Sequence, residues 1–271
     1  MANNMDIDNN SFTIRDIMDV TPNQRIAMLI DGDNAQPSMI EKMLAETTKY
    51  GLITIRRIYG DWTASNMGGW KEVLQTHAIQ PIQQFRYTVG KNATDSAMII
   101  DAMDLFYSGN VDGFCLVSSV SDYTRLATRI REQGIFVMGI GKKQTPRAFV
   151  NACDLFVYTE NLMPAEAPKP EQPAKNSHKK RSKTKNEEKD NSTPNPIPLL
   201  KKAFDLAAQE NGWAFLGSLG HHIRQLDPGF DSRTFGFRQL SLLIQAYPDE
   251  FETKEVKGSD GTSVIYARLK N

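Results

Sequence analysis

The sequence predicts an α/β domain of three layers built on a parallel sheet, followed by a smaller domain of helices and a hairpin. Short continuous apolar runs alternate with helix-like segments through residues 25–163, a pattern typical of βαβ units whose strands are buried on both faces. From residue 196 apolar residues recur at helical spacing and then form two runs around a Gly-Ser-Asp-Gly turn. A Pro-rich, basic stretch with almost no apolar residues separates the two patterns.

The first domain alternates strands and helices along its whole length. The expected strands are the apolar runs at residues 26–30, 53–59, 79–85, 113–117, 135–140 and 155–158. The expected helices are residues 37–50, 70–76, 94–107, 121–132 and 146–151. In a doubly wound sheet the first and fourth strands are neighbours, and ligands collect at the carboxyl ends of strands where strand order reverses.

The second domain is predicted to be a winged helix-turn-helix. We expect helices at residues 199–207, 216–226 and 234–247, and strands at 251–256 and 263–269. The predicted organisation is an extension at 1–24, the α/β domain at 25–163, a linker at 164–195 and the winged helix at 196–271. The linker cannot bury enough apolar surface to offset its chain entropy, so we expect it to be disordered. Its basic block at 175–185 is either a solvated tether or a tether that also contacts phosphates.

Composition excludes several classes of protein. No run approaches the ~18 apolar residues of a membrane span, and the first twenty residues lack a signal-peptide pattern, so we predict no membrane partner and a cytoplasmic location. Cys115 and Cys153 have no CxxC spacing and no His neighbour, which excludes a disulfide scaffold and a zinc finger. The 32 basic and 32 acidic residues balance, so net charge indicates no class of partner.

Acidic residues fall where strands of the first domain end and helices begin. Asp31 ends the first expected strand, Asp95 opens the helix after the third, and Asp122 lies between the fourth strand and its helix. Three converging carboxylates repel one another unless a cation neutralises them, and oxygen ligands suit Mg²⁺ or Mn²⁺. Such an ion can orient a water for attack on a phosphodiester. Asp95 and Asp122 also stand where first-turn acids only stabilise helices, so a purely structural role stays open for them. Asp31 is harder to explain in this way, because a carboxylate directly after a buried strand is costly to leave unpaired.

Neighbouring polar residues are expected to support this catalytic and metal site. Lys91 could contact a substrate phosphate or restrain an acid, whereas Asp101 lies about 120° around the helix from Asp95 and is expected to point elsewhere. The full supporting set is Asn34, Lys91, Ser118, Ser119 and Asp101, and Asp61 is a weaker fourth acid.

Four strings in the first domain together resemble the NYN family, which has the PIN-like ribonuclease fold. They are LIDGDN at 29–34, KNATDSAMIIDA at 91–102, LVSSVSDYTRLATRIREQG at 116–134 and TPRAFVNACDLFVYTE at 145–160. The resemblance covers roughly residues 25–162 and implies metal-dependent endonucleolytic cleavage of RNA. It maps the metal-binding acids to Asp31 and Asp95, with Asn34 supporting the first.

The third string departs from the family pattern. The family carries an acid where this chain has Val120, and a valine side chain cannot coordinate a metal. Asp122 follows two residues later and could partly substitute. We therefore expect weakened metal binding, and we expect Val120→Asp to raise magnesium-dependent cleavage.

The C-terminal segment resembles the LOTUS domain, also called OST-HTH, which is associated with RNA binding. The resemblance covers about residues 196–270 and rests on GWA at 212–214, LGSLG at 216–220 and FGFRQL at 235–240. Basic residues could contact phosphate or be plain solvated charges. The candidates are Arg224, Arg233, Arg238 and Lys257, together with Lys142 and Lys143 of the first domain.

The leading hypothesis is an RNA-processing protein in which a metal-dependent ribonuclease domain is tethered to an RNA-binding winged helix. The alternative is a catalytically inactive RNA-binding or regulatory adaptor, which Val120 favours. A Rossmann-like nucleotide binder is disfavoured because no GxGxxG follows the first strand. A DNA-binding repressor is disfavoured because the winged helix has no strongly basic composition. The RNA target and a homo-oligomeric state stay open.

Overall fold

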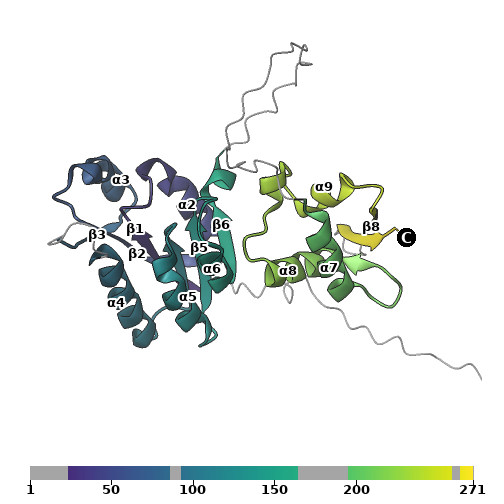
Figure 1. The fold of residues 1–271 in the computed structure, drawn as a ribbon, viewed down its shortest axis with the longest axis horizontal. Coiled ribbons are helices and arrows are strands. Elements are labelled where there is room, and N and C mark those ends of the chain that lie inside the picture. The colour runs from purple at the N-terminus through teal and green to yellow at the C-terminus, as the bar shows by residue number, and fades with distance from the viewer. Residues whose placement is uncertain (1–23, 86–92, 164–194, 258–262, 271) are drawn as a thin grey trace, which may run out of the picture.

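The computed structural model describes residues 24–85, 93–163, 195–257 and 263–270, which form two domains (Figure 1). The first is built on a parallel sheet in the order β3-β2-β1-β4-β5-β6, which confirms the predicted α/β fold class. Strand order reverses between β1 and β4, so their carboxyl ends border the crevice in which such sheets bind ligands. The strands are β1 (Arg25–Asp31), β2 (Leu52–Gly60), β3 (Gln80–Gln83), β4 (Gly113–Val117), β5 (Phe136–Gly141) and β6 (Leu155–Tyr158).

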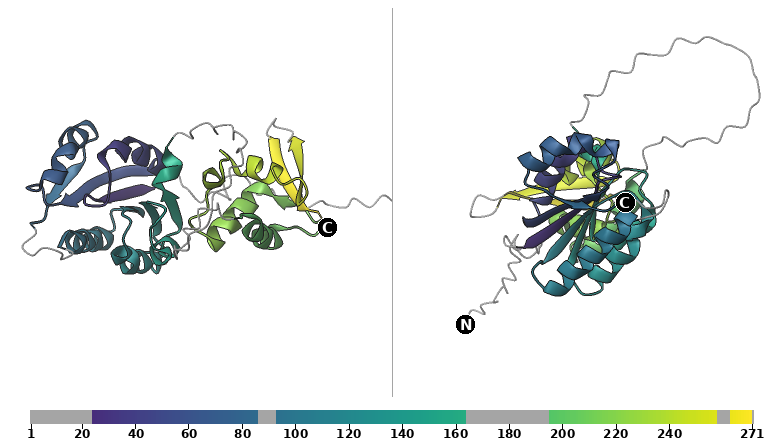
Figure 2. Two further views of the ribbon diagram at one scale, coloured as in Figure 1. Left: turned by 45° about the horizontal axis from the view of Figure 1, so that its top comes forward. Right: turned by 90° about the vertical axis from the view of Figure 1, so that its left-hand side faces the viewer.

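Helices cover both faces of this sheet (Figure 2). One face carries α2 (Ile40–Thr47) and α3 (Lys71–Thr76), and the other carries α4 (Ala93–Ser108), α5 (Thr124–Arg131) and α6 (Arg147–Ala152). Alternate residues of β1 serve the two cores: Met28 and Ile30 pack with the α2 layer, and Leu29 packs with the α4 layer. Because both faces of β1 are buried, its sequence is continuously apolar.

Most predicted elements of the first domain are confirmed, and the differences lie at the ends of helices and of the strand predicted at 79–85, which is only β3 (Gln80–Gln83). The predicted strands at 113–117 and 155–158 coincide with β4 and β6. The predicted helix at 37–50 is shorter, because its first turn is the 3₁₀ segment η1 (Pro37–Met39) and α2 ends at Thr47. The helix expected at 121–132 likewise begins with η3 (Ser121–Tyr123). Two 3₁₀ segments were not predicted, η2 (Ser65–Trp70) and η4 (Thr159–Leu162).

The second domain packs helices against a small antiparallel sheet in the order β7-β9-β8. Its elements are α7 (Ile197–Ala207), β7 (Ala214–Phe215), α8 (Leu216–Leu226), η5 (Ser232–Phe235), α9 (Leu240–Gln245), β8 (Phe251–Lys257) and β9 (Ser263–Leu269). The single helix predicted at 234–247 is wrong. Gly236 has a φ of 85°, a left-handed conformation that glycine adopts without strain and that ends a helical turn, so α9 begins only at Leu240.

The two domains are in contact through residues 227–235, which lie against β6 and α2. The backbone N–H of Phe156 on the edge strand β6 donates to the carbonyl oxygen of Pro228 at 2.8 Å. Gly229 approaches so closely that a Cβ there would lie 2.8 Å from the Tyr158 hydroxyl oxygen. The second domain therefore covers part of a sheet edge, whose unpaired backbone groups would otherwise be open to other chains.

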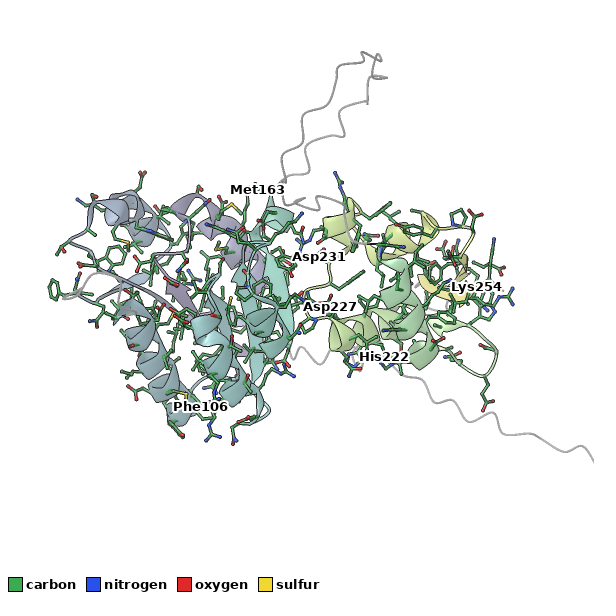
Figure 3. All side chains as sticks on the ribbon, in the orientation of Figure 1. Phe106, Met163, His222, Asp227, Asp231 and Lys254 are labelled. Carbon is green, nitrogen blue, oxygen red and sulfur yellow. The ribbon has the colours of Figure 1, made fainter. Side chains whose placement is uncertain are left out.

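Ion pairs join the domains at two further points. Arg233 donates to both carboxylate oxygens of Glu46 on α2, at 3.0 and 3.1 Å, and also bonds to Asp231 in its own loop. Arg147 on α6 pairs with Asp227 at 3.1 Å. Asp227 and Asp231 lie on the side of the second domain that faces the sheet (Figure 3). A packed contact thus joins the domains in addition to the chain that connects them.

The predicted extension at 1–24 and the predicted linker at 164–195 lie almost wholly outside the described residues, as does the Gly-rich turn of the hairpin. In the described part of the chain, none of the helices is long and apolar enough to cross a membrane.

Candidate active site

The site begins at the carboxyl end of β1, where the chain turns sharply. The carbonyl oxygen of Asp31 accepts from the N–H groups of Asn34 and Ala35, and the Gly32 N–H donates to the carbonyl oxygen of Tyr59 on β2. A Cβ on Gly32 would lie 2.7 Å from that carbonyl oxygen, so only glycine fits this turn. The turn brings the Asp31 and Asn34 side chains to the edge of the sheet that β4 also reaches.

The Asp31 carboxylate is fully buried and is held by neutral donors. One oxygen, Oδ2, accepts from Asn34 Nδ2 at 2.6 Å and from Ser118 Oγ at 2.9 Å, and Oδ1 accepts from the Asp33 backbone N–H at 3.1 Å. Burial raises the pKa of the Asp31 carboxyl despite these hydrogen bonds, and the negative charge of Asp95 raises it further. The site therefore holds a buried acid, Asp31. Hydrogen-bond donors stabilise its ionised form, and the charge of Asp95 destabilises it.

Tyr123 contacts Asp95, which lies in the first turn of α4, and it feels the charge of Asp31. The Tyr123 hydroxyl donates to Asp95 Oδ1 at 2.7 Å. Burial raises the pKa of Tyr123, and the charges of Asp31 and Asp95 raise it further, so this phenol stays protonated and acts as a donor. Sequence reasoning missed Tyr123. The signal available was its place in the Ser-Asp-Tyr string directly after β4.

The structure brings together some of the predicted site residues and separates others. Asp122 is exposed at the start of η3. Asp101 accepts hydrogen bonds from Arg57 and Tyr59 of β2, so it ties α4 to the sheet. Ser119 Oγ accepts from the backbone N–H of Lys142 and holds the turn after β5. Lys91 lies outside the described residues.

The convergence of three acids on one ion is not found among the described residues, where no group of three His, Cys, Asp or Glu side chains could hold a metal together. Mg²⁺ often uses only one or two protein carboxylates and takes its remaining ligands from water and substrate phosphate. The negative charge of Asp95 raises the pKa of Asp31, and a cation bound near both carboxylates would relieve this repulsion.

Val120 lies in the bend after β4, and its side chain is apolar. It is half-buried and packs against the core on the α4 face of the sheet. Its backbone N–H lies 3.4 Å from Ser118 Oγ. The position at which the resemblance implies an acid is therefore occupied by a side chain that contributes to the core.

The basic residues expected to contact RNA have different surroundings. Arg233 bonds to Glu46 and Asp231 through its guanidinium nitrogens, so it forms a contact between the domains and is neither of the two alternatives considered for it, a phosphate contact or a solvated charge. Arg224 lies close enough to Tyr50 for its charge to act on that hydroxyl. The remaining candidates are exposed or half-buried: Arg238, Lys257, Lys142 and Lys143.

An aromatic and basic surface that the sequence analysis missed lies on the outward face of the small sheet. Lys254 Nζ lies 4.1 Å from the centre of the Trp213 ring, and the Arg268 guanidinium lies 4.8 Å from the same ring. Tyr266 pairs with Phe215 on β7 and lies beside Lys254. Lys254 lies at the end of the second domain that is far from the first (Figure 3).

Sequence models of two domain families match the chain. A model of the NYN domain matches residues 25–160, and a model of the OST-HTH/LOTUS domain matches residues 190–261. Among curated proteins the comparison finds no match.

Solved structures similar to this chain include three from different organisms. A protein of unknown function from Vibrio parahaemolyticus is 18% identical, with 51% of this chain and 93% of that chain covered and a TM-score of 0.43. An uncharacterized protein from Nitrosomonas europaea is 28% identical, with coverages of 40% and 93% and a TM-score of 0.26. The second catalytic domain of a Group II chitinase from Ostrinia furnacalis is 11% identical, with coverages of 51% and 50% and a TM-score of 0.20. At these TM-scores none of the three informs function.

Proposed function

The chain belongs to the NYN domain family, and from this premise we propose that it is a divalent-metal-dependent ribonuclease whose winged-helix domain binds RNA. The observation that carries the proposal is the pair of acids at the strand-order reversal. Asp31 is buried among neutral donors, and Asp95 stands close enough for its charge to raise the pKa of Asp31. Such a pair is costly to ionise without a cation.

Each residue of this site has a distinct role in the proposed reaction. Asp31 and Asp95 would hold Mg²⁺ or Mn²⁺, which supplies a water activated for attack and neutralises charge on the phosphate. Asn34 and Ser118 orient the Asp31 carboxylate by donating to Oδ2. Tyr123 keeps its proton and orients Asp95 through its hydroxyl.

The winged-helix domain would hold the RNA strand that the first domain cleaves. Aromatic rings beside cations bind single-stranded nucleic acid by stacking bases and contacting phosphates, and Trp213 with Lys254 offers this combination. Arg268 adds a second cation at the same ring, although its guanidinium is paired with Glu252. Because the domains are also packed together at Glu46 and Arg233, RNA bound to the second domain would approach the first from a defined direction.

The decisive experiment measures cleavage of single-stranded and structured RNA by the full chain with Mg²⁺, with Mn²⁺ and with a chelator. We expect Asp31→Asn and Asp95→Asn each to reduce the cleavage rate by about 10³-fold, which is about 4 kcal/mol of transition-state stabilisation. Asp104→Asn is the matched control, because Asp104 is an exposed acid on the same helix as Asp95. Cleavage that continues unchanged in both site variants would contradict the proposal.

A second candidate function is an inactive RNA-binding adaptor, and the packing of Val120 in the core favours it. We expect Val120→Asp to raise cleavage in Mg²⁺ if the missing acid limits the reaction. RNA binding by the full chain without cleavage in any metal, and without a gain in Val120→Asp, would establish the adaptor function instead. Folding of Val120→Asp is checked by circular dichroism, because the new acid replaces an apolar core contact.

A further inference from the structure

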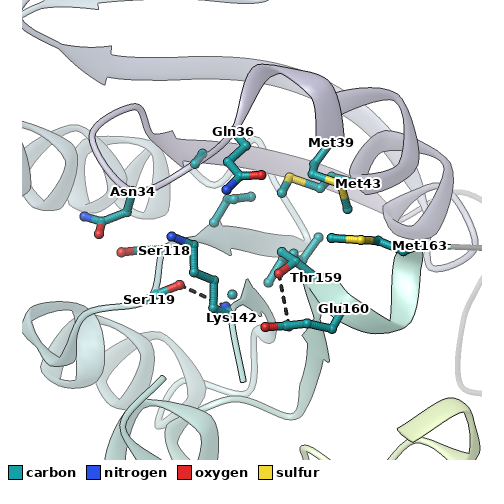
Figure 4. A pocket seen from close by; sticks show the side chains of 14 residues that line it. Asn34, Gln36, Met39, Met43, Ser118, Ser119, Lys142, Thr159, Glu160 and Met163 are labelled. Carbon is teal, nitrogen blue, oxygen red and sulfur yellow. Dashed lines mark hydrogen bonds between the residues drawn. The ribbon is translucent and has the colours of Figure 1, made fainter. Parts of the chain in front are cut away.

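A cavity of about 120 Å³ opens at the carboxyl ends of β1, β4, β5 and β6, next to Asp31 (Figure 4). Its apolar side is formed by Met39, Met43 and Met163. Its polar side includes Gln36 from the loop after β1 and Glu160 from η4, which follows β6. This is the strand-order reversal at which open parallel sheets bind ligands.

The cavity and the candidate active site share a wall. Asn34 and Ser118 line the cavity, and both donate to Oδ2 of Asp31 on their other side. Lys142 also lines the cavity, and its side chain extends toward Asn34 and Gln36 in Figure 4. The cavity therefore has a cation on the side where Asn34 and Gln36 lie.

We propose that this cavity binds one nucleobase of the RNA and so selects the nucleotide at which the RNA is cut. The inference rests on the proposed function, because it places the attached phosphate beside Asp31. A base has two apolar faces and a polar edge, and the cavity offers methionines for the faces and amide, hydroxyl and carboxylate groups for the edge. Methionine side chains adapt to the shape of a flat ligand and contact aromatic rings favourably.

The charge distribution matches a nucleotide rather than a neutral ligand. The ammonium group of Lys142 would contact the phosphate of the bound nucleotide, while Glu160 accepts from the Lys143 N–H and from Thr159 Oγ1 at the opposite side of the cavity. A carboxylate is an acceptor without a proton to donate at neutral pH. Uracil offers only its N3–H as a donor, and the carbonyl oxygens on both sides of it repel a carboxylate. We therefore expect bases with an exocyclic amino group to bind more tightly than uracil.

The test compares binding of the four 5′-mononucleotides and of ribose 5-phosphate to the full chain by ligand-observed NMR in the presence of a chelator. Gln36 is exposed and its side chain caps no helix, so Gln36→Trp places an indole at the cavity without disturbing the fold. We expect this variant to weaken mononucleotide binding by about tenfold or more. Ser38→Trp is the matched control, because Ser38 is exposed two residues away and does not line the cavity.

The outcomes separate this inference from the proposed function. Mononucleotides that bind no more tightly than ribose 5-phosphate would overturn the base site, even if Asp31→Asn abolishes cleavage. Binding that Gln36→Trp blocks and Ser38→Trp leaves intact would support the base site, even if no RNA is cleaved. When cleavage is present, sequencing of the cut ends adds a second readout, in which Gln36→Trp broadens the distribution of nucleotides at the cut and Glu160→Gln admits uracil.

Discussion

Two buried carboxylates lie at the end of β1 and in the last turn of α2, and their surroundings differ. Asp31 has no exposed surface, and neutral donors hold it: an amide, a hydroxyl and a backbone N–H. Glu46 is 6% exposed, and two cations hold it, Arg233 from the other domain and Lys49 from its own.

The pKa values of these two acids move in opposite directions for this reason. Burial opposes ionisation at both positions. At Glu46 the hydrogen bonds and charges of Arg233 and Lys49 outweigh burial and lower the pKa. At Asp31 burial and the charge of Asp95 outweigh the neutral donors and raise it. A carboxylate already neutralised by arginine serves a structural contact, whereas one left beside a second acid is suited to bind a cation from solution.

The largest effect expected on stability comes from removing Arg233, the cation that neutralises Glu46. Arg233→Met leaves Glu46 buried with Lys49 alone, and we expect the free energy of unfolding to fall by about 2 kcal/mol. The double variant with Glu46→Leu removes both charges and should recover most of that loss. Chemical denaturation measures both.

The control for this pair is Arg129→Met, which removes a surface partner of Glu132 at 3.6 Å and should change stability by less than about 0.5 kcal/mol. A double variant no more stable than Arg233→Met would show that packing, and not charge compensation, holds the domains together there.

A medium effect is expected from pH and metal. Because the pKa of Glu46 is lowered in the folded state, its carboxylate stabilises the fold above the unfolded pKa, and this stabilisation is lost as pH falls through the folded pKa. Glu46→Gln should therefore make the free energy of unfolding fall less steeply at acid pH. The raised pKa of Asp31 acts oppositely, because its contribution is present at low pH and is lost as pH rises through its folded pKa.

A bound cation should reduce the free-energy cost of ionising Asp31. At ten times its dissociation constant Mg²⁺ should stabilise the chain by about 1.4 kcal/mol, and Asp31→Asn should remove the response. Thermal unfolding with Mg²⁺ and with a chelator measures this. An equal Mg²⁺ response in Asp31→Asn would place the ion elsewhere.

The smallest effect is expected from removing the Tyr123 hydroxyl, which donates to Asp95. Tyr123→Phe removes the hydrogen bond to Asp95 at 2.7 Å, and we expect the free energy of unfolding to fall by about 1 kcal/mol. Tyr107→Phe, at an exposed tyrosine on α4, is the control and should change stability by less than about 0.5 kcal/mol. A loss no larger than that of the control would mean that Asp95 is oriented by other groups.

The sequence by itself determined the elements whose signals are local. The apolar run of β4 and its bounds at 113–117 follow from burial on both faces, and the position of Asp31 at a strand end follows from the same pattern. The neighbourhood of β1 and β4 followed from the topology rule for such sheets, and it correctly placed Ser118 beside Asp31.

Only the tertiary structure decided the contacts between residues far apart in the chain. Glu46 and Arg233 are 187 positions apart, and a periodic pattern contains no information about which arginine meets which acid. Asp122 and Tyr123 are adjacent, yet one side chain is exposed and the other reaches Asp95, because the turn of η3 and the start of α4 together set where each points. Local patterns follow from the repeat of a strand or a helix, whereas a site depends on how distant elements pack.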